Sequence, residues 1–468
     1  MTDSISRRLA QFVRGLRFDD LPPEVVDKAK ALTLHSFGTA LVNYSLPETQ
    51  HAIDLIKEEE SVRSGGSTIL VDGTKATKVG AAYANYEMFH GQGDTYRMLT
   101  HPGETIFPGA LAVLEGAEAT GREFITAIVA GYEVQERLTG DFVPSVMARG
   151  FHAGPAFGIF GPAVAAGKLL RFDEEQMNTT IALCVSLASG NLEGTRSGGR
   201  AVREGGSVRN AMLAVLLARG GMRGGETTIE GDAGFYHSFV GNNKGKLTYA
   251  FGGRKTTRLS MVTADLGRRW EVMDTVHKTI PTGGYNMPHV EVTARLCADN
   301  RIAPEDVEKV ELVVNWLETQ NPSPAFPRPR SKGPRAGGSE YYAAYGVVKR
   351  GYPADRRRVA RSSADGDPPE VLEMMKKIHI IPSKTQTVFG PKIAIHTKDG
   401  RVYRAEATGR EFMWDLAEEK RRVRELVPLM PIQVGRFEEL LAATSGLEGL
   451  DRADRLIELT LTPKSHAD

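Results

Sequence analysis

A polar cluster between two apolar runs contains the residue types in this sequence that are best suited to chemistry. Within twelve positions the chain places His90, Asp94, Thr95, Tyr96, Arg97, Thr100 and His101. Glycines and prolines interrupt the cluster, and both residues disfavour a single regular helix there. The pattern predicts a helix, a polar loop and a second helix starting near Pro108. Polar loops between packed helices often carry catalytic groups; the alternative is a solvated connection.

Three histidines lie in separate segments rich in glycine or proline: His101 in THPG, His152 in GFHAG and His289 in YNMPH. A neutral imidazole can take a proton from a carbon next to a carboxylate. Arginine and lysine bind carboxylates through charge-assisted hydrogen bonds and stabilise enolate-like charge. These residue types suit a small polycarboxylate substrate. The candidate cations and phenol are Arg200, Arg203 and Arg209 in one glycine-rich loop, Lys278, and Tyr342.

Each candidate also has a structural interpretation. His152 can be a histidine whose hydrogen bonds are satisfied within the fold, and the arginine-rich loop can be solvated or form a subunit contact. Tyr342 lies in YYAAY, which has the apolar spacing of a helix core. No dinucleotide-binding, P-loop, zinc-protease or serine-hydrolase motif occurs in a usable context. The spacing alone therefore indicates an anion-binding enzyme with histidine acid–base chemistry.

Composition narrows the function classes. The 468 residues carry a net charge of +1, so the whole chain gives no electrostatic signal for nucleic acid or an anionic membrane. The two cysteines, Cys184 and Cys297, are too few for an iron–sulfur cluster or a cysteine zinc site. They are expected to be buried thiols in a reducing compartment. No stretch approaches the ~20 apolar residues of a membrane span, so we expect a soluble cytoplasmic protein.

Apolar periodicity predicts a mostly helical protein with a smaller α+β part. Helical spacing dominates residues 1–266, with almost no convincing strand. Residues 267–405 contain alternating runs typical of strands, including a hairpin at Asp399-Gly400. Helical spacing returns over 406–468. We therefore expect a large helical domain built from both ends of the chain, with an inserted α+β lid domain.

Several of these segments, in this order, resemble the MmgE/PrpD family, which includes 2-methylcitrate dehydratase, cis-aconitate decarboxylase and iminodisuccinate epimerase. The resemblance covers nearly the whole chain. It rests on LPPEVVDKAKALTLHSFGTALVNY, AAYANYEMFHGQGDT, THPGETIFPGALAVLEG, ARGFHAGPAFG, GGSVRNAMLAVLLARGG, HKTIPTGGYNMPH, EYYAAYGVVKRG and RADRLIELTL. The family fold is a helical domain with an α+β lid. Known members are homodimers that use no metal or organic cofactor.

The resemblance also assigns site residues by position. Asp94, Thr95 and His101 correspond to the family's active-site loop, and His152 to the histidine of its GFH segment. Lys278 and Tyr342 correspond to a lysine and a tyrosine of the lid. Two departures stand out. The family loop commonly holds several aspartates, whereas only Asp94 occurs here, and Arg200 stands where the family often has a lysine. Arginine keeps the charge but cannot exchange a proton as lysine does.

Together these observations predict a cofactor-independent lyase for a small di- or tricarboxylate. Dehydration of a 2-methylcitrate-like hydroxy acid is the first hypothesis. Decarboxylation of cis-aconitate and epimerisation next to a carboxylate are the alternatives, and a non-catalytic helical scaffold that binds a partner is the alternative of another class. We expect a homodimer that binds neither nucleic acid nor membrane and contains no metal. The predicted catalytic residues are His101, His152, Asp94 and Tyr342, and the predicted substrate-binding residues are Thr95, Arg200, Arg203, Lys278 and His289.

Overall fold

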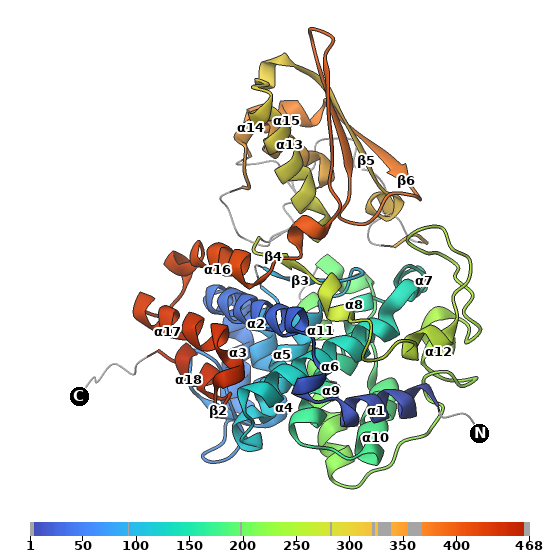
Figure 1. The fold of residues 1–468 in the computed structure, drawn as a ribbon, viewed down its shortest axis with the longest axis vertical. Helices are drawn as coiled ribbons and strands as arrows, with labels where there is room; N and C mark the ends of the chain where they lie inside the picture. Colours follow the sequence, from blue (N-terminus) through green and yellow to red (C-terminus); the bar gives the residue numbers. More distant parts are fainter. Residues whose placement is uncertain are drawn as a thin grey trace.

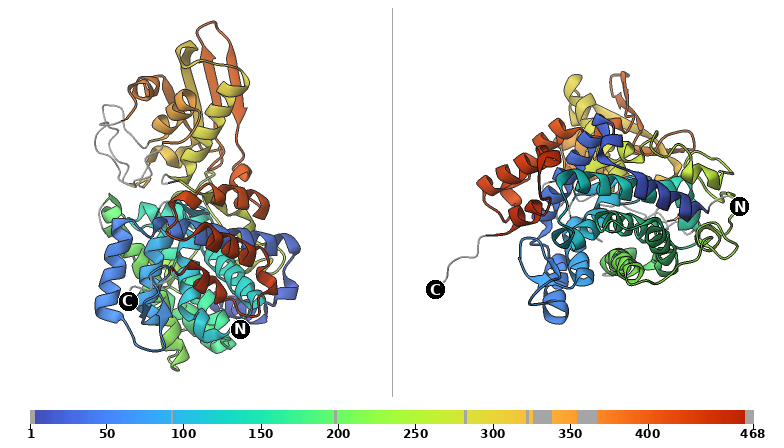
Figure 2. Two further views of the ribbon diagram at one scale, coloured as in Figure 1. Left: turned by 90° about the vertical axis from the view of Figure 1, so that its left-hand side faces the viewer. Right: turned by 60° about the horizontal axis from the view of Figure 1, so that its bottom comes forward.

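The protein consists of a large helical unit and a smaller α+β unit that projects from one end of it (Figures 1 and 2). The computed structural model describes residues 4–91, 93–196, 199–280, 283–320, 323–325, 338–353 and 367–462. Apolar side chains form two large cores. One core combines residues from 5–272 with Leu317 and residues from 416–459, and the other combines residues between 290 and 407. The predicted fold class, mostly α with a smaller α+β part, is confirmed.

Both ends of the chain build the helical unit (Figure 1). Its first helices are α1 (Ile5–Gly15), α2 (Pro23–Asn43), α3 (Pro47–Glu60), α4 (Lys78–Phe89), α5 (Pro102–Ala117) and α6 (Gly121–Thr139). They are followed by α7 (Val143–Ala148), α8 (Ala153–Phe157), α9 (Phe160–Leu169), α10 (Glu174–Leu187), α11 (Gly199–Arg219) and α12 (Phe235–Val240). The C-terminal helices α16 (Leu416–Arg424), α17 (Val434–Ser445) and α18 (Arg455–Thr460) complete it. Within the described ranges, no helix is both long enough and apolar enough to cross a bilayer.

Small residues allow the central helices α5, α6 and α9 to approach closely. A Cβ atom at Gly109 of α5 would lie 2.3 Å from the Pro162 side chain of α9, and one at Gly131 of α6 would lie 2.9 Å from the Gly161 carbonyl. Side chains larger than glycine would force these backbones apart. Gly109 and Gly131 therefore determine how closely α5 and α6 pack against α9. This packing holds the N-terminus of α5 at the junction of the two units.

Two short strands lie at that junction. β3 (Asp94–Tyr96) pairs antiparallel with β4 (Val276–Lys278), and the register places Asp94 opposite Lys278. In Figure 1 both strands lie between the helical unit and the α+β unit. A second pair, β1 (Ser67–Thr68) and β2 (Lys75–Ala76), lies elsewhere in the helical unit. These strands have two or three residues each, too few for alternation to predict them.

The α+β unit is a four-stranded sheet with helices packed against it. The strand order is β6-β5-β7-β8, with β5 parallel to β6 and antiparallel to β7. Its strands are β5 (Val307–Asn315), β6 (Ile378–Ser383), β7 (Lys392–Thr397) and β8 (Val402–Glu406), and its helices are α13 (Met287–Asp299), α14 (Ser339–Lys349) and α15 (Pro369–Met375). The predicted hairpin is confirmed, and Gly400 adopts the left-handed backbone (φ 86°) that its turn requires.

Two predicted helix boundaries are wrong. Helix α5 begins at Pro102 and continues through Pro108, because burial of the neighbouring Ile106 and Phe107 outweighs the backbone hydrogen bond that Pro108 cannot make. Helix α11 begins at Gly199, so Arg203 and Arg209 lie on a helix rather than in a loop. Gly205 is required in α11 because a Cβ atom there would lie 2.7 Å from the Tyr83 ring of α4.

Candidate functional site

The pairing of β3 with β4 builds a buried ion pair at the junction of the units. Lys278 Nζ lies 3.0 Å from Asp94 Oδ1, and the two residues each expose 2% of their surface. Burial would raise the pKa of Asp94, but the Lys278 charge and the interaction with His101 hold that pKa well below its usual value. Asp94 is therefore a carboxylate in the folded protein.

His101 stands at the N-cap of α5 and faces this carboxylate. Its Nδ1 lies 3.4 Å from Asp94 Oδ2 and 3.5 Å from Glu104 Oε1. The Tyr96 ring packs edge-on against the imidazole, with 4.3 Å between ring centroids, and the Lys278 ammonium lies 5.2 Å from the centre of the same ring. Two carboxylates beside Nδ1 favour a proton on that nitrogen. Nε2 is then the atom of His101 that can exchange a proton with a substrate.

A strained turn delivers His101 to this position. Met98 and Leu99 both have positive φ, 47° and 62°, in the turn that joins Arg97 to Thr100. Side chains other than glycine, asparagine and aspartate rarely adopt this conformation, and each such residue costs about 1–3 kcal/mol. The surroundings hold the turn, because the Thr100 hydroxyl lies 2.6 Å from the Arg97 carbonyl and 3.1 Å from Glu136 Oε1.

Thr95 supports the site through the backbone. Its Oγ1 accepts a hydrogen bond from the Gly103 N–H at 2.9 Å, which attaches β3 to the first turn of α5. A Cβ atom at Gly103 would lie 2.7 Å from that oxygen, so glycine is required there. The contact of Thr95 with substrate remains a prediction, and the hydrogen bond to Gly103 gives its hydroxyl a positioning role.

A second polar cluster continues from His101 into the helical unit. His90 Nδ1 contacts Glu104 Oε2 and lies 3.6 Å from Glu204 Oε2, and the Tyr86 hydroxyl donates to Glu204 at 3.1 Å. All four residues are buried. Sequence reasoning did not single out Glu104 or Glu204 as site residues. The sequence did contain one indication that Glu104 belongs to the site: it follows His101 by three residues, in HPGE.

His152 lies at the far end of this cluster. It is the N-cap residue of α8, where its Nδ1 accepts from the Gly154 N–H at 3.1 Å and lies 3.2 Å from Glu204 Oε1. Arg203 Nη2 lies 3.2 Å from the same oxygen and also donates from Nη1 to the Asn191 carbonyl. Alternating acids and imidazoles thus connect His101 with His152, whose side chain is 17% exposed.

The other predicted residues lie elsewhere or outside the described side chains. His289 of α13 pairs with Glu318, with 2.9 Å between Nε2 and Oε2. Tyr342 lies in the core of the α+β unit, and its ring packs edge-on against Tyr341 with centroids 5.4 Å apart. The side chain of Arg200 is not among those that the structure describes. The roles of these three residues remain predictions.

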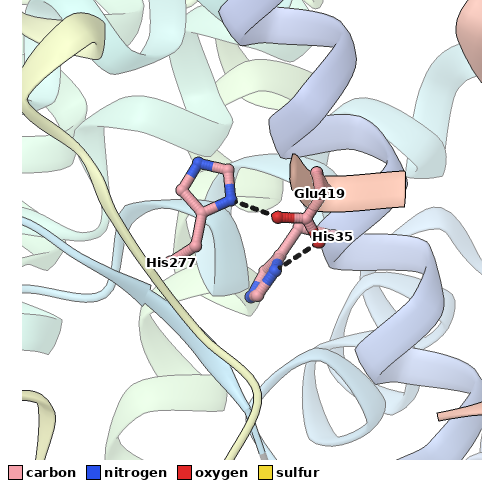
Figure 3. Close-up of side chains that lie close together, drawn as sticks. All are labelled: His35, His277 and Glu419. Atoms are coloured by element: carbon pink, nitrogen blue, oxygen red, sulfur yellow. Dashed lines mark hydrogen bonds and ion pairs between the residues drawn. The ribbon is translucent and has the colours of Figure 1, made fainter. Parts of the chain in front are cut away.

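A third buried cluster, which sequence reasoning missed, lies behind β3 and β4. Glu419 of α16 accepts from both His35 of α2 and His277 of β4, and the oxygen–Nδ1 distances are 2.9 and 2.6 Å (Figure 3). Lys28 Nζ lies 2.8 Å from His277 Nε2 and donates to the Thr275 carbonyl at 2.7 Å. We call Lys28, His35, His277 and Glu419 the rear network.

Three buried sets of side chains bring possible metal-ligand atoms within 4.8 Å of one another: His35, His277 and Glu419; His90, Glu104 and Glu204; and Asp94, His101 and Glu104. Hydrogen bonds and ion pairs account for the contacts in each set. In the first, the Lys28 ammonium adjoins His277, and in the third the Lys278 ammonium adjoins Asp94. A nearby ammonium disfavours a second cation. We therefore keep the prediction of a metal-independent site at Asp94 and His101, where the Lys278 ammonium lies.

Chelators are expected to leave the predicted lyase activity unchanged. After prolonged dialysis against EDTA, kcat and KM should equal those of the undialysed enzyme, because protein cations already neutralise the site carboxylates. Metal analysis before and after dialysis provides the control. Loss of activity that is restored by an added divalent ion would contradict this expectation.

Acid is expected to destabilise the fold through the rear network. Burial and the Lys28 charge lower the pKa of His277 from 6.5 to about 3. The unfolded chain therefore binds the extra proton at a higher pH than the folded protein, so stability is full above pH 6.5 and falls as the pH drops towards 3. The complete loss, reached below pH 3, is ~5 kcal/mol for this one group. Urea denaturation between pH 7 and 4 should show a steeper loss in the wild type than in His277→Asn; parallel losses would exclude this group as the cause.

The sequence has named relatives. A family model, the MmgE/PrpD N-terminal domain, matches residues 7–248. The chain is 26% identical to the cis-aconitate decarboxylase of Aspergillus terreus over 278 residues, which cover 57% of this chain and 54% of the relative. It is 24% identical to the human cis-aconitate decarboxylase, with 50% of each chain covered. The chain thus spans about half the length of the curated relatives it matches. The match to the family model covers more than half of the chain, and the protein therefore belongs to the MmgE/PrpD family.

Proposed function

We propose that the protein is a cofactor-independent lyase that acts on a small di- or tricarboxylate at Asp94, His101 and Lys278. The observation that carries the proposal is the meeting of a buried carboxylate, an imidazole and an ammonium at the junction of the two units. Family membership supports a lyase-type enzyme. Low exposure strengthens electrostatic interactions in such a site and keeps water from the reacting atoms.

In the proposed mechanism, His101 transfers a proton at a carbon next to a substrate carboxylate. Asp94 orients the ring by facing Nδ1, and it stabilises the imidazolium that forms when Nε2 takes a proton. Lys278 holds a substrate carboxylate and opposes the enolate-like charge that develops. Arg203, which lies beside His152, binds a second carboxylate.

Decarboxylation of a cis-aconitate-like acid is our first choice of reaction, because the relatives named above carry that activity in their names. The bond to CO2 breaks, its electron pair passes into the substrate, and a proton from the enzyme replaces CO2 in the product. Dehydration of a 2-methylcitrate-like hydroxy acid is the second candidate. It requires a base for the carbon-bound proton and an acid for the departing hydroxide, and the second imidazole, His152, favours it.

The test is a panel of citrate-, methylcitrate- and aconitate-type acids followed by NMR, which detects CO2 loss, water loss and epimerisation alike. Turnover of at least one acid by the wild type, and not by His101→Gln, would support the proposal. Binding without turnover would favour the non-catalytic alternative. Epimerisation alone would keep the site and replace the reaction.

Opening and closure of the α+β unit complete the proposal. Asp94 and Lys278 are nearly inaccessible in this structure, so the substrate would enter when the unit opens and be enclosed when it closes. We expect a tricarboxylate inhibitor to slow hydrogen exchange in the segment from Trp270 to His289, of which residues 281–282 lie outside the described part of the chain. Peptides from α17 should serve as the unchanged control. Equal exchange rates with and without saturating inhibitor would exclude closure.

A further inference from the structure

The rear network lies directly behind the proposed site and belongs to three distant parts of the chain. His35 comes from the middle of α2, His277 from β4 and Glu419 from α16 (Figure 3). All three side chains are completely buried. The network contacts the site through β3, because His35 Nε2 lies 3.0 Å from the carbonyl oxygen of Asp94. On β4, His277 immediately precedes Lys278.

The two ring nitrogens of His35 both face acceptors. Nδ1 lies 2.9 Å from a Glu419 carboxylate oxygen, and Nε2 faces the Asp94 carbonyl. A carbonyl oxygen can only accept, and an ionised carboxylate can only accept. Each nitrogen must therefore donate a proton, and a ring that donates from both nitrogens is an imidazolium.

We propose that His35 is a buried imidazolium that holds the Asp94 backbone in register with Lys278, and is thus a positioning residue of the site. The inference rests on the proposed function only for its catalytic consequence. The charge state follows from the two hydrogen bonds together with the ionised state of Glu419. His35 does not touch the reacting atoms, and it acts through the strand that carries Asp94.

His277 provides an internal contrast. Its Nδ1 also faces Glu419, at 2.6 Å, but its Nε2 lies 2.8 Å from Lys28 Nζ, an amino group that can donate whether it is charged or neutral. Nε2 can therefore accept from Lys28, and this ring needs no second proton. Burial and the Lys28 charge lower the pKa of His277 to about 3, in agreement with this assignment. Two imidazoles thus share one carboxylate while carrying different charges.

The charges around the network agree with this assignment. Burial would raise the pKa of Glu419, but His35 and His277 lower it to about 2, so Glu419 is a carboxylate. Burial lowers the pKa of Lys28 to about 7, against the opposing influence of Glu419, Asp274, Asp415 and Asp27. The elements around His35 thus contribute one carboxylate in direct contact, and that carboxylate balances the imidazolium.

The charge state can be read from the resting protein. In protein labelled with 15N-histidine at pH 7.5, we expect one buried ring to show two slowly exchanging N–H protons and imidazolium nitrogen shifts. That signal should disappear in His35→Gln and remain in His51→Gln, a control at an exposed position of α3. A second buried ring, assigned through His277→Asn, should show a single N–H at Nδ1. A neutral His35 ring with one proton would overturn the inference.

A second variant keeps the test decisive if His35→Gln does not fold. In Glu419→Gln, an amide replaces the balancing charge, so His35 should lose the imidazolium signal. Persistence of that signal would overturn the assignment.

The positioning role is tested by steady-state kinetics. The kcat of His35→Gln should fall by about 10- to 100-fold with little change in KM, because small misplacements of reacting groups lower the rate. Unchanged kcat would overturn that role while leaving the proposed function intact, and the NMR result is independent of turnover.

Discussion

The variant His101→Gln is expected to lower kcat by about 10²- to 10⁴-fold, the usual contribution of a general acid or base. The glutamine amide can occupy the N-cap of α5 but cannot exchange a proton. Because the glutamine amide can still donate to the two carboxylates that His101 faces, the thermal midpoint should stay close to that of the wild type. Steady-state kinetics and thermal unfolding measure the two quantities.

An exposed histidine provides the matched control for this variant. His237 lies on α12 with its side chain in solvent, and His237→Gln should keep full activity. Wild-type turnover in His101→Gln would show that another group transfers the proton. A lowered midpoint accompanied by lost activity would instead indicate that the variant damages the fold.

The variant Lys278→Met is expected to lose activity and about 3–5 kcal/mol of stability. Removing one partner of a buried ion pair leaves the other charge without compensation, and the Asp94 carboxylate lies beside Lys278 with almost no exposure to solvent. Urea denaturation at pH 7.5 measures the free energy of unfolding. The size of the loss separates this pair from surface ion pairs, which contribute about 0–1 kcal/mol.

A double variant tests whether the unpaired charge of Asp94, rather than the lost packing of the Lys278 side chain, causes the loss of stability. In Asp94→Asn combined with Lys278→Met neither site carries a charge, so the free energy of unfolding should recover most of the loss. Activity should remain absent, because both groups are required in the proposed mechanism. If Lys278→Met is as stable as the wild type, the ion pair does not exist in solution and the geometry of the site must be different.

Local patterns in the sequence predicted most of the fold. Helical spacing identified the long helices, and alternation with Asp399-Gly400 identified the hairpin of β7 and β8. The start of α5 was predicted six residues late, at Pro108 instead of Pro102. Proline fits a first helical turn, but sequence alone cannot reveal that a packed core compensates for a proline inside a helix.

The sequence predicted individual residues of the site but not which of them contact one another. Asp94, His101 and Lys278 stood out by type and context, and the structure brings them together through a strand pair too short to predict. Glu204 gave no comparable signal, because a glutamate on a helix usually faces solvent. His35 and Glu419 are separated by 384 positions. Only the fold makes them neighbours, so no local pattern could have paired them.

The most direct test of the central claim, proton transfer at His101 next to a substrate carboxylate, is deuterium incorporation in D2O. Enzyme equilibrated in D2O is mixed with the acid that the panel identifies, and NMR locates the deuterium in the product and in the recovered substrate. We predict deuterium at a carbon next to a carboxylate with the wild type, and none with His101→Gln in the same time. If the panel identifies a dehydration, the reaction is run in the hydration direction, because the unsaturated product keeps no hydrogen on the reacting carbon. Turnover that leaves the carbons next to the carboxylates free of deuterium in the decarboxylated, epimerised or hydrated product would contradict the account.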